Sequence, residues 1–263
     1  MSLPPNPFPD VLPRYRRFER LFQAQDSLGD VINEIFDTQT DKLQVREGQE
    51  EDLSLLVIAA LGKGMKTSQA VTRLCLLGYG EDALILIRSN MNPLINIAYI
   101  LAENPTERVK DFLAFSYQER IKYLRLAYGV QEPPWPPPVS PAEVEQRAKA
   151  WRDIPLAQKA DMGFQWHYTQ GYRLYSSLEH SDAWGLNEYI QDWDEVGPQI
   201  GSEESDKHID LALVHNYGML ADLLLIVCKF FDIDQAELFE RVRKVWSDLG
   251  AAVITEPSGG SST

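Results

Sequence analysis

The residues GMKTSQAVTRLCLLGYGEDALILIRSNMNPLINIAYILAENPTERVKDFLAFSYQERIKYLR, from Gly64 to Arg125, decide the fold of this chain. Apolar residues recur through them at helical spacing, and alternating strand patterns are almost absent from the whole sequence. Arg88, Asn92 and Arg120 stand among residues that otherwise form a core pattern. Because polar groups that interrupt an apolar face need partners, we expect any special chemistry to lie here.

The segment that opens at Glu81 is expected to be the central helix of the fold. It has acidic residues in its first turn and is apolar on all sides from Ala83 to Ile87, which is typical of a buried helix. Pro93 removes one backbone donor and crowds the preceding turn. We therefore expect either a kink or a restart of the helix with Asn92 as its N-cap.

A capping-box pattern marks the start of the next helix. Asn104 precedes Pro105 and is followed three residues on by Glu107, and an apolar stripe then continues to Tyr128. The segment GVQEPPWPPPVSP, residues 129–141, cannot be helical and is typical of a stiff, polyproline-like link. We expect this Pro-rich linker to separate two helical lobes.

Helical periodicity elsewhere predicts further helices at about residues 15–37, 50–77, 142–151, 156–179, 203–231 and 235–249. The Trp-, Gly- and Asp-containing stretch between 179 and 203 is expected to be irregular. The predicted fold class is all-α: a multi-helix bundle with a kinked central helix. Residues 1–249 are expected to form a single helical domain, followed by a flexible tail at 250–263.

The charge balance argues against nucleic acid as a partner. The chain has 25 Lys and Arg against 39 Asp and Glu, a net charge of -14 and a pI near 4.7. Such a charge opposes binding to a phosphate backbone. A local basic patch is one hypothesis for Arg14, Arg16, Arg17 and Arg20, but their spacing favours a solvated helix face.

Three features favour a cytoplasmic protein with no membrane partner. Cys75 and Cys228 lie far apart in apolar surroundings, as small buried hydrophobic residues do. The N-terminal residues MSLPPNPFPD lack the basic start and the apolar core of a signal peptide. The most hydrophobic run, from Met219 to Phe231, is shorter than the roughly 20 residues that span a bilayer.

The linear motifs of the common cofactor and metal sites do not occur: the sequence lacks GxGxxG, a Walker loop, HExxH, GxSxG and CxxC. His208, His215 and Asp222 recur every seven residues, which places successive groups about 10 Å apart along a helix. That distance is too long for one metal ion to bind all three. We expect no cofactor and no metal.

One helix face in the segment YRLYSSLEHSD carries groups suited to phosphate chemistry. This face carries a cation, two hydroxyls and an imidazole at i, i+3, i+4 and i+7: Arg173, Ser176, Ser177 and His180. Their arrangement resembles the loose Arg-x(4–6)-His signature of the helical nucleases of the higher-eukaryote-and-prokaryote nucleotide-binding group, in which both residues act at the scissile phosphate. So short a pattern also arises by chance, and an imidazole at a helix end can simply satisfy free carbonyl groups.

The run KTSQAVTRLCLLGYGEDALILIRS, the Asn-Pro helix start, FLAFSYQERIKYLR and YRLYSSLEHSD together resemble the bacterial family called domain of unknown function 5677. The likeness covers roughly residues 63–189 and implies an all-helical fold with no assigned activity. In this family an acidic residue commonly stands four positions after the Arg that corresponds to Arg88. Asn92 holds that place here.

Arg88, Arg120 and His180 lie on or beside apolar stripes of three helices, so we expect them to converge in one polar cluster. One hypothesis is a structural network, because buried charges are retained only when they are paired. The other is a site for a small anionic ligand or a scissile phosphate. There the two Arg would form the clamp, Asn92 and Ser177 would line the site, and His180 would be the acid or base.

Binding or regulation by a module without cofactor is the function that these observations favour, with a homodimer as one expected assembly. The alternative is a metal-independent helical ribonuclease or toxin-like enzyme acting through Arg173 and His180.

Overall fold

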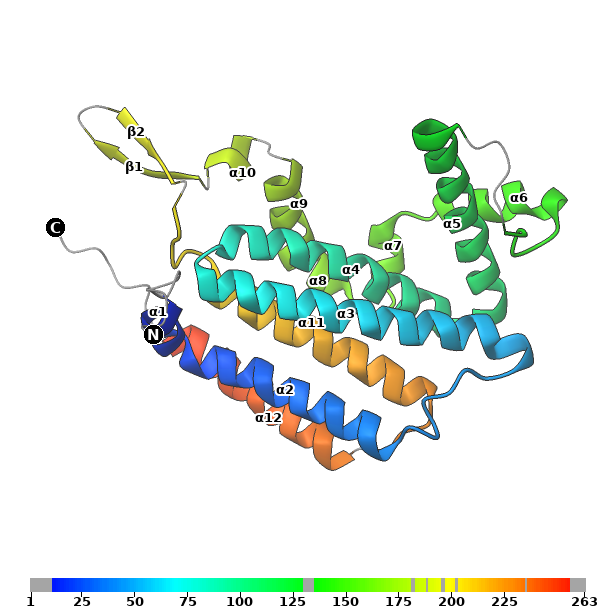
Figure 1. Ribbon diagram of the computed structural model, residues 1–263, viewed down its shortest axis with the longest axis horizontal. Coiled ribbons are helices and arrows are strands. Elements are labelled where there is room, and N and C mark those ends of the chain that lie inside the picture. The colour runs from blue at the N-terminus through cyan, green and yellow to red at the C-terminus, as the bar shows by residue number, and fades with distance from the viewer. Residues whose placement is uncertain are drawn as a thin grey trace, which may run out of the picture. The chain divides into compact units, whose positions relative to one another are not determined.

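The computed structural model describes residues 11–129, 135–180, 183–187, 189–194, 197–201, 203–234 and 236–255. Most of these residues are helical and the helices pack on one another, which confirms the predicted all-α multi-helix bundle (Figure 1). The stretch expected to be irregular contains a short antiparallel hairpin of β1 (Ile190–Asp194) and β2 (Gly197–Ile200). The Gly and Pro in β2 argue against a strand in the sequence, but a two-stranded sheet has only edge strands, which tolerate them.

The helices, in chain order, are α1 (Val11–Arg17), α2 (Glu19–Thr38), α3 (Glu51–Leu77), α4 (Gly80–Ala102), α5 (Pro105–Tyr128), α6 (Pro141–Arg152), α7 (Leu156–Ala160), α8 (Gln165–His167), α9 (Arg173–His180), α10 (Ala183–Asn187), α11 (Ile209–Phe230) and α12 (Ala236–Thr255). A 3-10 turn, η1 (Gly48–Glu50), leads into α3, and a π-helical turn, η2 (Tyr168–Tyr172), joins α8 to α9.

Two predicted helix starts have a different local structure from the expected one. α4 continues through Pro93, so the helix does not restart at Asn92. α5 begins at Pro105 with Asn104 as its N-cap, as predicted, but Asn104 has a left-handed backbone and its side chain makes no capping hydrogen bond. The Glu107 carboxylate instead accepts a hydrogen bond from Lys110, at 2.9 Å.

The single helix expected over residues 156–179 is wrong, because this segment forms α7, α8, η2 and α9. Gly163, between α7 and α8, has a φ of 118°, a conformation that interrupts a helix and favours glycine. In η2, a Cβ atom at Gly171 would lie 2.6 Å from the Tyr175 ring. The wide π-turn therefore brings a backbone without a side chain against a buried aromatic ring.

The helices are grouped in two compact units. Unit 1 comprises Met1–Gln44, Ile58–Leu94 and His167–Thr263, and unit 2 comprises Val45–Val57 and Ile95–Trp166. The Pro-rich segment at 129–141, of which 130–134 lie outside the described residues, joins α5 to α6 within unit 2. This differs from the expectation that it separates two lobes. The reason is that α5 and α6 pack against each other, which a linker sequence does not reveal.

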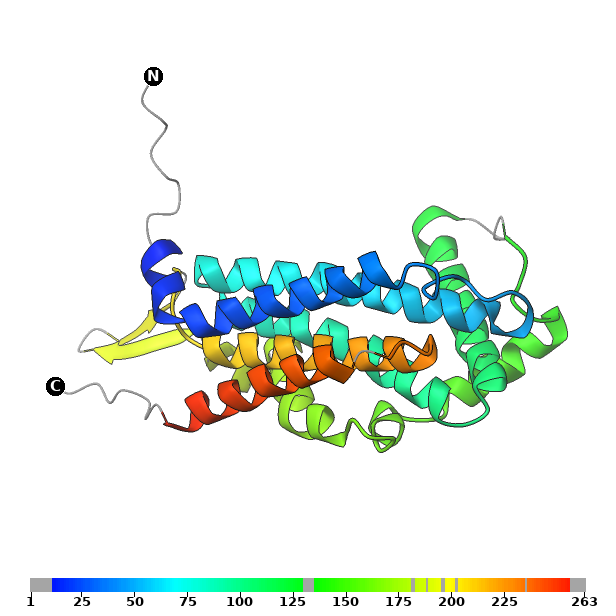
Figure 2. The same cartoon turned by 90° about the horizontal axis from the view of Figure 1, so that it is seen from below.

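α11 is the most deeply buried long helix of unit 1. α2 and α12 pack against it (Figures 1 and 2). Gly64 lets α3 lie close to α11, since a Cβ atom at Gly64 would lie 2.6 Å from the side chain of Leu223. Inside this packing, the Asn216 amide of α11 donates hydrogen bonds to Gln25 of α2 and Ser68 of α3, both at 2.8 Å. The buried Asn216 amide group thus links three helices, although its own side-chain oxygen has no hydrogen-bond partner among the described residues.

α4 and α11 are long and apolar enough to cross a membrane by length and composition alone. Buried residues make up 56% of the apolar window in α4 and 72% of that in α11. The core helices of a bundle pass the same test, so this finding is weak evidence for a membrane span.

The turn between α3 and α4 is a close junction with the loop before α11. Gly78 has a φ of 86°, and its carbonyl accepts a hydrogen bond from the Ser205 amide at 2.8 Å. Arg14 donates to the Leu76 carbonyl at 3.1 Å and pairs with Asp206 at 2.9 Å. One member of the hypothetical basic patch therefore holds α1 against this junction.

Gly80 offers a direct test of the junction. A Cβ atom at Gly80 would lie 2.1 Å from the backbone oxygen of Lys207, which cannot turn aside as a side chain can. We expect Gly80→Ala to lower the free energy of unfolding by about 2 kcal/mol or more, measured by urea denaturation. Gly62, exposed within α3 with nothing within 4 Å of its Cβ position, is the matched control. Gly62→Ala should stabilise by about 0.5–1 kcal/mol; equal effects would contradict the close approach.

Candidate functional site

Arg88 on α4 holds η2 and α9 through four contacts in unit 1. Its Nε donates to the Ser176 hydroxyl at 2.9 Å and its Nη2 to the Tyr172 hydroxyl at 3.2 Å. The guanidinium also lies 4.9 Å from the centroid of the Tyr172 ring and forms an ion pair with Glu179. With 15% of its side chain exposed, Arg88 is a mostly buried cation with a complete set of partners.

Glu179 supplies the carboxylate that Asn92 cannot supply. It was not among the predicted candidates, although the sequence holds a signal for it. Glu179 lies three residues after Ser176 and seven after Tyr172, so all three side chains share one helix face. The acidic partner of Arg88 thus comes from α9 rather than from α4 itself.

The other predicted site residues have separate environments. Asn92 is half-buried, and its side-chain oxygen is buried without a hydrogen-bond partner among the described residues. Ser177 is buried, and His180 is exposed at the end of α9. The side chain of Arg173 lies outside the described residues. Arg120 belongs to unit 2, where its guanidinium stacks 3.7 Å from the centroid of the Trp135 ring.

A hydrogen bond between His167 and Asp222 fixes the other end of the same segment. The Nε2 atom of His167 lies 2.7 Å from the Asp222 carboxylate of α11. His167 is buried and Asp222 is partly exposed. The sequence groups Asp222 only with the His residues of its own helix, and nothing in it shows that α8 reaches α11. Residues 167–180 are thus held to α11 at one end and to α4 at the other.

His215 is a neutral core residue at neutral pH. Burial, and secondarily the positive charge of His167, lower its pKa to about 4. Its ring packs edge-on against Tyr175, with 5.6 Å between the centroids. Burial raises the pKa of Tyr175, whose hydroxyl has no hydrogen-bond partner among the described residues. No group of three or more His, Cys, Asp or Glu suited to a metal ion occurs in the described part of the chain.

Unit 2 contains a buried lysine in an aromatic cage. The Nζ atom of Lys159 lies 3.6 Å from the centroid of a Trp151 ring and 6.0 Å from that of Tyr99. It donates a hydrogen bond to the Trp151 carbonyl at 3.2 Å. Burial lowers the pKa of Lys159 to about 8. No spacing pattern in the sequence predicts this cage, because its members come from three different helices.

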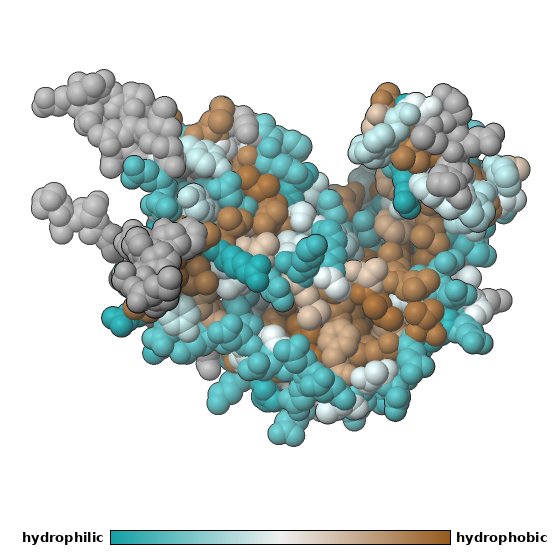
Figure 3. Space-filling model, in the orientation of Figure 1, coloured by the Kyte–Doolittle hydropathy of each residue, from teal (hydrophilic) through white to brown (hydrophobic). Residues whose placement is uncertain are grey.

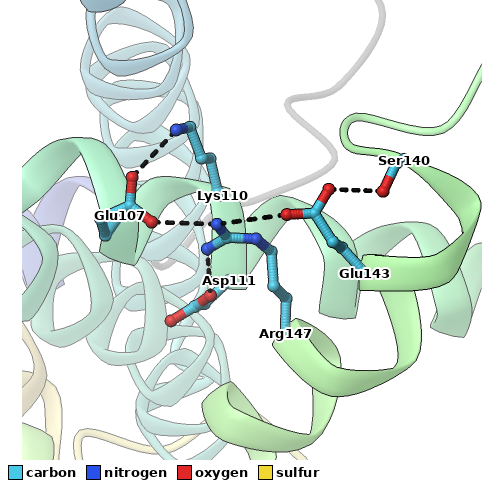
Figure 4. A network of polar contacts seen from close by, with 6 residues as sticks. All are labelled: Glu107, Lys110, Asp111, Ser140, Glu143 and Arg147. Atoms are coloured by element: carbon cyan, nitrogen blue, oxygen red, sulfur yellow. Dashed lines mark hydrogen bonds and ion pairs between the residues drawn. The ribbon is translucent and has the colours of Figure 1, made fainter.

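Arg147 is the centre of a polar network that holds α6 against α5 (Figure 4). Its guanidinium lies 3.0 Å from Asp111 and 2.9 Å from Glu107, both on α5. Hydrogen bonds from Lys110 and then Arg147 lower the pKa of Glu107. All these groups are satisfied within the network, so it is a structural feature of unit 2.

Among the described residues of unit 2, the large apolar side chains with the highest exposed fractions lie at the C-terminal end of α5. Leu126 is 88%, Tyr128 68% and Tyr123 59% exposed. The two Tyr rings pack edge to face, with centroids 5.9 Å apart. We call residues 119–128, together with Trp135, the α5 end. Although α5 has 24 residues, only Val109 and Ala114 are buried.

These features define a helical-bundle protein whose internal cations Arg88 and Arg147 are held by its own side chains. Apolar residues reach the surface in several places, as Figure 3 shows for one face, and the described large apolar side chains with the highest exposed fractions lie at the α5 end. The chain matches the model of the family of unknown function DUF5677 over residues 54–197, more than half of its 263 residues. It therefore belongs to this family, as the resemblance predicted. Comparisons with curated proteins and with solved structures gave no match.

Removing the Arg88 side chain should destabilise unit 1. We expect Arg88→Ala to lower the free energy of unfolding by about 2 kcal/mol. The loss is smaller than the roughly 3–5 kcal/mol for a fully buried pair, because water can hydrate Glu179, which is 38% exposed. Arg243→Ala, from a pair with both side chains more than two-thirds exposed, is the control and should change stability by less than about 0.5 kcal/mol. Equal losses would mean that the Arg88 contacts contribute nothing.

The buried lysine predicts a pH dependence of stability. The pKa of Lys159 is about 8 when folded and about 10.5 when unfolded, so the unfolded chain binds more protons between these values and stability rises with pH there. We expect the unfolding free energy of the wild type, relative to Lys159→Met, to rise by about 3 kcal/mol from pH 8 to 10.5 and to stay level below pH 8. Denaturation series of both variants measure this difference. Replacing the exposed Lys149 by Met is the control, and the same slope in both comparisons would refute the prediction.

Proposed function

We propose that this protein is a binding module that docks another protein chain on the α5 end. The observation that carries the proposal is the cluster of exposed side chains there, Tyr123, Leu126 and Tyr128, on two consecutive turns of one helix. Single exposed apolar residues are normal on a protein surface, whereas a contiguous cluster of large ones is typical of an interaction site.

The residue types at the α5 end also support docking. Tyr, Trp and Arg are enriched at the centres of protein interfaces, where they contribute most of the binding energy. The α5 end carries two Tyr and the stacked pair of Arg120 and Trp135. Aromatic rings that are already packed against a neighbour lose little conformational freedom on binding.

The competing proposals have weaker support. A small anionic ligand at Arg88 would have to replace Glu179, Ser176 and Tyr172 at the same guanidinium. A ribonuclease acting through Arg173 and His180 has no further observation in its favour beyond the exposure of His180. A module that binds protein without a cofactor uses groups that the fold leaves accessible, and we place it in the cytoplasm because of its two buried free thiols.

The proposal predicts that one substitution at the α5 end removes a protein partner. The tagged whole chain, purified from cells of its source organism, should retain a stoichiometric partner that Leu126→Asp loses, because a carboxylate there would be desolvated on docking. Leu186→Asp, at a leucine of α10 that is 55% exposed, is the matched control and should retain the partner. Circular dichroism should show that all three proteins are folded. A partner retained equally by all three would contradict the proposal.

A further inference from the structure

We infer that the segment that docks on the α5 end is acidic and carries apolar side chains. This inference rests on the proposed function and adds the chemistry of the partner. It follows from the exposed cations at the α5 end, whose sign is opposite to that of the net charge of the whole chain.

The α5 end is locally basic on an acidic protein. Among the described residues of the α5 end, Arg120, Lys122 and Arg125 are exposed and Glu119 is the one carboxylate. The whole chain has a net charge of -14. The cations therefore stand out against their surroundings and would attract acidic groups, which accelerates encounter and selects the partner.

The positions of these cations suit a carboxylate beside an apolar group. The Arg120 guanidinium lies over the Trp135 ring, 3.7 Å from its centroid, so the cation stands directly beside an apolar group. Lys122 pairs with Glu119 at 2.6 Å. It directly precedes Tyr123 and lies one turn before Leu126 in the same helix. Cations thus lie beside the exposed apolar side chains, as in an interface with an apolar centre and a polar rim.

Two other occupants fit less well. Single-stranded nucleic acid also uses aromatic rings and cations, but the net charge of -14 repels a phosphate backbone at long range. A second copy that paired its own α5 end about a two-fold axis would place the same three cations opposite one another. An acidic segment of a different protein avoids the like-charge pairing of a second copy. It also meets less long-range repulsion than a phosphate backbone, because it carries fewer charges along its length and can add apolar side chains.

A peptide display library tests the inference with the whole chain as bait. Random peptides of about twelve residues are selected for binding to the wild type, and those that also bind Leu126→Asp are removed from the pool. We expect the enriched peptides to combine several Asp or Glu with aromatic or aliphatic residues. The Kd of a synthetic peptide from this pool should rise about tenfold for Arg120→Gln/Arg125→Gln and rise further with salt, but not for the exposed Lys66→Gln.

Each remaining outcome overturns the inference. Enriched peptides that are neutral or basic, or a Kd that is independent of salt, would mean that the partner is not acidic, although loss on Leu126→Asp would still support docking at the α5 end. Tighter binding of a fluorescent oligouridylate would indicate nucleic acid instead. A dimer in light scattering that Leu126→Asp dissociates would indicate a second copy. If no peptide depends on Leu126, the inference fails and the partner purification decides the proposed function separately.

Discussion

The pairing of Arg88 is the constraint on which the arrangement of unit 1 depends. A guanidinium on an otherwise apolar helix must find a carboxylate and hydrogen-bond acceptors, because an unpaired buried charge costs several kcal/mol. Asn92 cannot meet this need from within α4, so η2 and α9 meet it with Tyr172, Ser176 and Glu179. The pair of His167 and Asp222 then holds the start of the same segment to α11. A stretch interrupted by a π-turn, with little helical stability of its own, is thereby fixed at both ends.

Much of the fold follows from local signals in the sequence. Asn104 and Pro105 mark the start of α5, and Gly78 ends α3 with the positive φ that only glycine adopts easily. The same local signals fail over residues 156–179. The helical periodicity of the sequence is continuous there, but the observed structure is divided into α7, α8, η2 and α9. The break depends on the fit of Gly171 against the Tyr175 ring, a tertiary contact that no periodicity contains. The position of the Pro-rich segment fails for the same reason, since the packing of α6 on α5 decides it.

The candidate site was predictable in part. Arg88 was identifiable because a charged residue inside an apolar helix is rare and needs a partner. Its actual partner Glu179 and the pair of His167 with Asp222 were not, because these contacts join segments 55 or more residues apart. Exposure is harder still to predict. Leu126 continues the apolar stripe of α5, and only the absence of a covering element in the described structure makes it a surface residue.

Most cations inside the fold have internal partners, whereas the large apolar side chains of the α5 end face water, and this difference connects the fold to the proposed activity. In the described part of the chain, the cations Arg88 and Arg147 are engaged by carboxylates, and Lys159 by aromatic rings and a carbonyl. Their interaction energy is already used to position helices, so a ligand at any of them would have to replace an internal partner. At the α5 end the large apolar side chains face water, and in the pair of Lys122 with Glu119 both side chains are about half exposed. Docking there would bury apolar area that now faces water and would bring carboxylates close to exposed cations. Both changes would lower the free energy of the complex.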